Sequence, residues 1–174
     1  MKRNFFYIMA TAAVFFTACT VEGTYTGEKP DPKPANPEPM ILTIKGTGEK
    51  TIELAGSGTA SIDWGGSVDE LALSSSVRSV KHTYTSGTEQ TVKITGENIT
   101  TLDCKRIQLS GLDVSKNSGL KVLNCSFNLL ESLNVDKNTN LTNLWCYNNN
   151  ITALKVNGLN ALKALDVSTK RLGG

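Results

Sequence analysis

The stretch that decides the fold is residues 120–130, which read LKVLNCSFNLL, and a matching stretch at residues 141–151 reads LTNLWCYNNNI. Cysteines at positions 104, 125 and 146 are separated by two equal steps of 21 residues. A fixed period of about 20–29 residues indicates stacked turns that each bury an apolar face against the next turn. The same step connects five further ladders: Ile99, Leu120, Leu141 and Leu162; Leu102, Leu123, Leu144 and Leu165; Leu109, Leu130, Ile151 and Leu172; Leu112, Leu133 and Leu154; Val114, Val135 and Val156.

Both stretches contain a leucine-rich pattern, LxxLxCxxN followed by one residue and Leu or Ile, with cysteine where a third leucine is usual. Together with LDVSKN at residues 112–117, this pattern resembles the repeats of internalin J and of Bacteroidota surface lipoproteins. The resemblance covers about residues 97–172. The resemblance is weaker at three positions: Ile107 and Lys170 replace the repeat's Asn, and Val167 replaces its Cys. Terminal repeats often depart from the pattern in this way. It implies a short right-handed leucine-rich-repeat solenoid of about three and a half repeats over residues 97–174, with little true helix.

The cysteines at 104, 125 and 146 are expected to form a structural ladder of buried thiols, since a thiol can fill an inward strand position as a small hydrophobe. A disulfide is one alternative, but three is an odd number and neighbouring parallel strands stack their side chains in one direction. A metal site is the other alternative, yet the single histidine of the chain, His82, lies outside the repeats. The favoured interpretation is therefore Cys104, Cys125 and Cys146 as free, buried thiols.

The N-terminus has the order of a secretory signal: Lys2 and Arg3, then an apolar run too short to span a membrane, then small residues. Its ending, FTAC at residues 16–19, resembles a bacterial lipobox. The resemblance implies a signal peptide over residues 1–18, lipidation of Cys19 and an outer-membrane anchor. We expect the protein to face the cell surface, and a periplasmic orientation is the alternative. Thr20 in place of Asp implies that the inner-membrane retention signal is missing. Cleavage by ordinary signal peptidase is the alternative.

The charge balance argues against a nucleic-acid partner. The sequence pI is about 8.3, but Lys2 and Arg3 are the only charged residues among residues 1–18. Without them the 18 basic residues fall to 16, which equals the number of acidic residues. No stripe of Lys and Arg remains, so the electrostatic footprint that nucleic-acid binding requires is missing.

Residues 19–39 carry all five prolines of the chain between polar residues, which favours an extended, semi-rigid linker. Residues 40–96 then show pairs of apolar residues separated by one residue, with Gly and Ser stretches between them. Short strands with such turn signals predict a small β-sandwich. The phrases SIDWGG at 61–66 and HTY at 82–84 resemble the PKD-type sandwich, although its glycine-turn Asp and a later Tyr are missing. The resemblance implies a structural role for His82, closing a hairpin.

The outward face of the repeats offers a candidate ligand site. Alternate residues of a strand point to opposite faces, so inward cysteines predict that Trp145 and Tyr147 point outward together. A pair of large exposed aromatic side chains is typical of a recognition surface. The predicted patch consists of Trp145 and Tyr147 with the polar neighbours Asn143, Asn124 and Ser126.

These features predict a non-enzymatic, lipid-anchored envelope protein, an adhesin or capture module that binds a glycan or host protein through the repeat face. The alternative is a scaffold or accessory subunit of a bacterial envelope complex. Neither a nucleophile motif nor an ion-binding loop is recognisable, so we expect no catalysis, no metal and no cofactor. No amphipathic cap follows Val167. We therefore expect either weak end-to-end self-association through an uncapped C-terminal repeat or a missing C-terminal segment.

Overall fold

The computed structural model describes residues 37–168, which all lie within one compact unit. Every regular element among these residues is a β-strand, so the prediction of a mainly β chain is confirmed. None of them forms a helix long and apolar enough to cross a membrane. The predicted signal peptide, the lipidation site Cys19, most of the linker and the last ladder residue, Leu172, fall outside the described residues.

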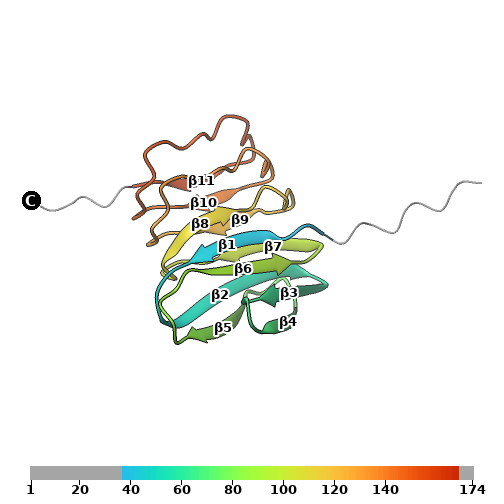
Figure 1. The fold of residues 1–174 in the computed structure, drawn as a ribbon. Coiled ribbons are helices and arrows are strands. Elements are labelled where there is room, and N and C mark those ends of the chain that lie inside the picture. The colour runs from blue at the N-terminus through green and yellow to red at the C-terminus, as the bar shows by residue number, and fades with distance from the viewer. Residues whose placement is uncertain (1–36, 169–174) are drawn as a thin grey trace, which may run out of the picture. The chain divides into compact units, whose positions relative to one another are not determined.

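Eleven strands follow one another along the described chain (Figure 1). Five of the first six, β1, β2, β3, β4 and β6, are the ones expected from the paired apolar residues of the middle region. The bounds are β1 Met40–Ile44, β2 Gly48–Ser57, β3 Thr59–Asp63, β4 Val68–Ala72, β5 Arg78–Tyr84, β6 Gln90–Thr95, β7 Asn98–Asp103, β8 Leu109–Asp113, β9 Val122–Asn124, β10 Asn143–Trp145 and β11 Ala164–Asp166.

Two sheets supply the inward side chains of a single core. The five-stranded sheet has the order β4-β3-β6-β1-β8, and the six-stranded sheet has the order β11-β10-β9-β7-β2-β5. Burial alternates along the strands as a period of two requires; β1, for example, buries Met40, Leu42 and Ile44 and leaves the two residues between them half-buried. The alternation of apolar residues in the sequence therefore gives each strand one buried face and one more exposed face.

Both sheets continue past the predicted boundary between residues 96 and 97. β7 pairs antiparallel with β2, with Leu102 opposite Leu54. β8 pairs antiparallel with β1, with Leu112 opposite Leu42. The first turn of the repeat region is thus hydrogen-bonded on this side by strands of the middle region, which covers edges that would otherwise be free.

The 21-residue step of the sequence is also the strand register. β7, β9, β10 and β11 pair in parallel, and Leu102 lies opposite Leu123, Leu123 opposite Leu144, and Leu144 opposite Leu165. Figure 1 shows β9, β10 and β11 one above another in chain order. The backbone repeats as well: the residues with positive φ include Arg106, Phe127 and Asn148, with values of 58°, 56° and 53°. Each turn therefore bends at the same place.

Trp64, which follows β3, closes one end of the core and is 1% exposed. Its ring stacks on His82 with centroids 5.1 Å apart, and His82 meets the edge of Tyr84 at 4.6 Å. The Tyr84 hydroxyl donates to the Trp64 carbonyl at 2.9 Å, and the Trp64 indole N–H donates to Asp69 at 2.8 Å. His82 is thus held between two aromatic rings, a packing role rather than an isolated reactive group.

Candidate functional site

Two buried asparagines organise the bends beside the candidate site. The Asn128 Oδ1 accepts from the backbone N–H groups of Ile107 and Leu109 at 3.1 and 3.0 Å. Its Nδ2 donates to the carbonyls of Cys104 and Cys125 at 2.9 and 3.0 Å. Each asparagine thereby satisfies backbone groups of its own turn and of the turn before, which buried peptide groups require.

Asn149 takes the equivalent position one turn later. Its Nδ2 donates to the carbonyls of Cys125 and Cys146, each at 2.9 Å, and its Oδ1 accepts from the Leu130 N–H at 3.0 Å. These contacts join the asparagine-rich bend to the turn before it. They leave the amides of both asparagines committed to structure and not to an ion or a ligand.

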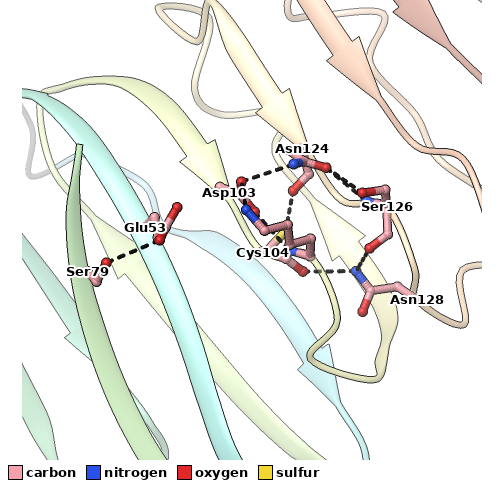
Figure 2. A network of polar contacts seen from close by, with 8 residues as sticks. Glu53, Ser79, Asp103, Cys104, Asn124, Ser126 and Asn128 are labelled. Carbon is pink, nitrogen blue, oxygen red and sulfur yellow. Dashed lines mark hydrogen bonds and ion pairs between the residues drawn. The ribbon is translucent and has the colours of Figure 1, made fainter. Parts of the chain in front are cut away.

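A second column of polar side chains bonds the backbone just after three of the four parallel strands; Figure 2 shows two of them, Asp103 and Asn124. Asp103 accepts from the Lys105 N–H at 3.1 Å, Asn124 from the Ser126 N–H at 3.2 Å, and Asp166 from the Ser168 N–H at 3.1 Å. A side chain that bonds the backbone two residues ahead is an Asx-turn, a common device for ending a strand. The column therefore has a clear structural purpose.

The third turn breaks this column at Trp145. Trp145 lies opposite Asn124 on one side and Asp166 on the other. An indole cannot accept a hydrogen bond, and among the described residues the N–H of Tyr147 has no acceptor like those of its three counterparts. Three turns use a polar residue that stabilises the bend, and one turn replaces it with the largest aromatic side chain.

The predicted patch residues lie on the outward face with unequal exposure. Trp145, Tyr147, Asn143 and Asn124 are half-buried, and Cys146 between the two aromatic residues is buried. The prediction of an exposed Ser126 is wrong, because this side chain is 0% exposed. Its hydroxyl donates to the Asn124 Oδ1 at 2.7 Å. Its equivalents in the neighbouring turns are the longer Lys105 and Tyr147, which explains why a small side chain between them is covered.

Two contributors to this surface were missed by the sequence reasoning. Phe127 meets Tyr147 edge to face, with centroids 5.1 Å apart and planes at 75°. The Arg106 guanidinium lies 3.7 Å from the centroid of the Phe127 ring, a cation–π contact. We call Phe127, Trp145 and Tyr147 the aromatic surface. The sequence did contain a signal for this bend. Arg106 and Phe127 lie 42 and 21 residues before Asn148, and asparagine is a residue type that tolerates the left-handed conformation, so the same conformation could have been expected at all three positions.

The left-handed conformation is costly for Arg106 and Phe127. A bulky side chain at positive φ is an outlier with a cost of about 1–3 kcal/mol, and such strain gathers at functional sites. In this bend the Phe127 ring contacts Tyr147, and the Arg106 guanidinium lies over Phe127. The strained backbone of Phe127 and the missing Asx-turn at Trp145 therefore belong to the same surface.

Two acidic residues in the same cross-strand row as Trp145 already have partners. Asp103, opposite Glu53 in the β2–β7 register, accepts from Lys105 Nζ at 2.9 Å and from Asn124 Nδ2 at 3.0 Å. The hydrogen bond to Asp103 is the main cause of the raised pKa of Lys105. Ser79 donates to Glu53 at 3.2 Å (Figure 2). Both carboxylates are therefore bonded to neighbouring residues of the protein.

The three ladder cysteines are free thiols buried in the core. Burial raises the pKa of all three, and that of Cys146 reaches about 11. A raised pKa disfavours the thiolate, the reactive form. Cys146 also lines a cavity of about 280 Å³ at the end of the stacked turns, together with Asn149, Leu154 and Val167. Within residues 37–168 no group of three His, Cys, Asp or Glu side chains is placed to hold a metal ion.

The chain matches no family model, and no curated protein or solved structure is significantly similar to it.

Proposed function

We propose that this chain is a non-enzymatic, lipid-anchored protein of the bacterial outer membrane that captures a glycan or a host protein through the aromatic surface. In this proposal residues 97–174 form a right-handed leucine-rich-repeat solenoid on a PKD-like sandwich. Cys19 carries the lipid, and the proline-rich linker extends the binding part from the membrane. A tether of this kind suits a protein that must reach a ligand.

The observation that carries the proposal is Trp145 in a position that three other turns give to an Asx-turn. A residue that breaks a local structural rule without a compensating contact is expected at a functional site. The half-buried indole and phenol rings offer flat apolar faces, and the polar side chains of Asn124 and Asn143 lie beside them. A sugar ring stacks its C–H face on such rings while a neighbouring amide bonds its hydroxyl groups, and the Asn143 Nδ2 has no hydrogen-bond partner among the described residues.

The test separates structure from function by comparing Trp145→Asn with Trp145→Ala. Asparagine can restore the Asx-turn, so we expect it to unfold with about 1 kcal/mol more free energy than the alanine variant. Both variants should lose binding to immobilised mucin and to a printed glycan array, measured against the unchanged chain. Val68→Asn, an equally polar change at a residue 59% exposed in β4 and outside the repeats, is the matched control and should bind normally.

Binding that follows stability, with Trp145→Asn active and Trp145→Ala inactive, would contradict a direct role for the indole. Retention of binding by both variants would place the site elsewhere. The same rings suit a protein hot spot, which is the basis of the alternative function as a scaffold in an envelope complex. Capture of a defined envelope protein from the organism's own membranes, lost in both variants and unaccompanied by glycan binding, would favour that alternative.

A further inference from the structure

Among residues 37–168, β11 is the outermost strand of the six-stranded sheet on one side. β11 ends the strand order, and among the described residues no strand pairs with its outer side. In each earlier turn the N–H of the ladder cysteine donates to the following turn: Cys104 to Asn124 O, Cys125 to Trp145 O and Cys146 to Asp166 O, at 2.8, 2.8 and 2.9 Å. The equivalent N–H belongs to Val167 and has no such acceptor within residues 37–168. An unpaired row of this kind is a template for another strand.

The side chains at this edge are those that earlier turns bury. Leu102, Leu123 and Leu144 are 0% exposed, whereas Leu165 at the same position is 43% exposed. The thiols at the Cys position are at most 3% exposed, whereas Val167 is 45% exposed. The cavity of about 280 Å³ opens beside Val167. The edge therefore combines free hydrogen-bonding groups with an apolar end face, and a partner must supply both a strand and an apolar surface.

Other edges of the described chain do not fit this requirement. The edge of the five-stranded sheet at β4 carries Asp69 and Glu70, whose charges discourage pairing with another strand. On the opposite side of the stacked turns, β7 and β8 are already paired with β2 and β1. The other edge of the six-stranded sheet is β5, which carries Arg78 and Lys81 and has the charges that discourage edge pairing. Head-to-tail stacking of copies is thus blocked, and the β11 face of one copy fits best against the β11 face of another.

We propose that two copies of this chain pair through β11 in an antiparallel, two-fold arrangement. With Leu165 opposite Leu165 of the second copy, Ala164 lies opposite Asp166, so no like charges face one another. The Val167 N–H gains a carbonyl acceptor, and the two exposed apolar ends cover each other. A two-fold contact of this kind closes at a dimer and does not grow into a fibre.

The arrangement has a consequence that rests on the function proposed above. A two-fold axis perpendicular to a continuous sheet places the outward faces of both copies on the same side. The dimer therefore presents two aromatic surfaces in one direction. Two linked sites can bind a multivalent glycan or protein more tightly than either site alone.

The primary test measures the mass of the purified chain by sedimentation equilibrium from low to high micromolar concentration. We expect a monomer–dimer equilibrium for the unchanged chain. Val167→Pro deletes the free N–H but none of the hydrogen bonds between β10 and β11, so it should raise the dissociation constant at least about tenfold. Its thermal midpoint, measured at concentrations where the chain is monomeric, should change little. This first variant isolates the strand pairing.

Leu165→Lys places two positive charges opposite each other and should also prevent dimerisation, which tests the proposal if the proline variant fails to fold. Val77→Lys is the matched control: Val77 is 53% exposed on the middle region, and its substitution should leave dimerisation unchanged. A monomer at every concentration would overturn the proposal. So would an unchanged dimer in Val167→Pro or Leu165→Lys, or loss of the dimer in Val77→Lys. Because mass is measured without a ligand, the result is independent of the aromatic surface.

Discussion

The turn at residues 120–130 and the turn at residues 141–151 share their inward residues and differ on their outward face. Both bury leucines, a cysteine and an asparagine at matching positions. Outward, the first turn has Asn124 and Ser126 joined by hydrogen bonds, and the second has Trp145 and Tyr147. Each inward side chain packs against the equivalent residues of the neighbouring turns, so the same residue types recur at the inward positions. The outward positions are not constrained by this packing. There the turn at residues 141–151 has aromatic side chains in place of the hydrogen-bonded polar pair.

The largest expected effect comes from placing a charge at the shared inward position. Cys125→Asp buries an unpaired carboxylate between two turns and should unfold the stacked turns. Cys125→Val keeps a small apolar side chain and should cost about 1 kcal/mol or less. Cys146→Asp should be tolerated better, because the cavity beside Cys146 can admit water to the carboxylate. Circular dichroism and thermal unfolding measure all three. Normal folding of Cys125→Asp would show that the inward register is off by one residue.

Replacing the buried asparagine should give the next largest loss of stability, and the size of the loss should differ between the two turns. Asn128→Ala leaves at least four buried backbone groups without their partner and should lower the free energy of unfolding by about 3–4 kcal/mol. Asn149→Ala should cost about half as much, since Asn149 lines the terminal cavity and water can replace its amide. Chemical denaturation of the two variants measures the difference. Asn143→Ala, at a half-buried outward residue, is the control and should cost less than either.

The last expected effect appears only at alkaline pH, where the folded protein should lose stability. The thiols titrate near pH 9 when unfolded, whereas burial raises their pKa in the folded protein, that of Cys146 to about 11. Above about pH 9 the unfolded state therefore binds fewer protons than the folded state, and stability falls as pH rises. Each buried thiol contributes a slope of up to about 1.4 kcal/mol per pH unit.

Chemical denaturation at several pH values between 8 and about 10.5 tests this dependence. Cys125→Val lacks one of the three thiols and should show a shallower decline than the unchanged chain. Tyr84, whose pKa is also raised by burial, is present in both proteins, so its contribution cancels in the comparison. Equal slopes in the two proteins would mean that Cys125 is ionised as easily in the folded state as in the unfolded state.

Much of the fold was predictable because it depends on the direction of side chains along a strand. The period of two in residues 40–96 anticipated β1, β2, β3, β4 and β6, and the 21-residue step anticipated which residues lie opposite one another in β7, β9, β10 and β11. Both patterns follow from the way the strand backbone directs its side chains, so a single sequence is enough to recognise them. The candidate site was partly predictable for the same reason: an inward Cys146 requires an outward Trp145 and Tyr147.

What the sequence alone determined, then, is which side of each strand a residue occupies and which residue lies one turn away. The tertiary structure decided how much of each outward side chain is covered, because coverage depends on the length and conformation of neighbours in other turns. Thus Ser126 is buried between longer side chains, and Phe127 reaches Tyr147 only through a left-handed bend. It also decided that β2 and β1 pair with β7 and β8, since hydrogen bonds between strands distant in sequence leave no local pattern.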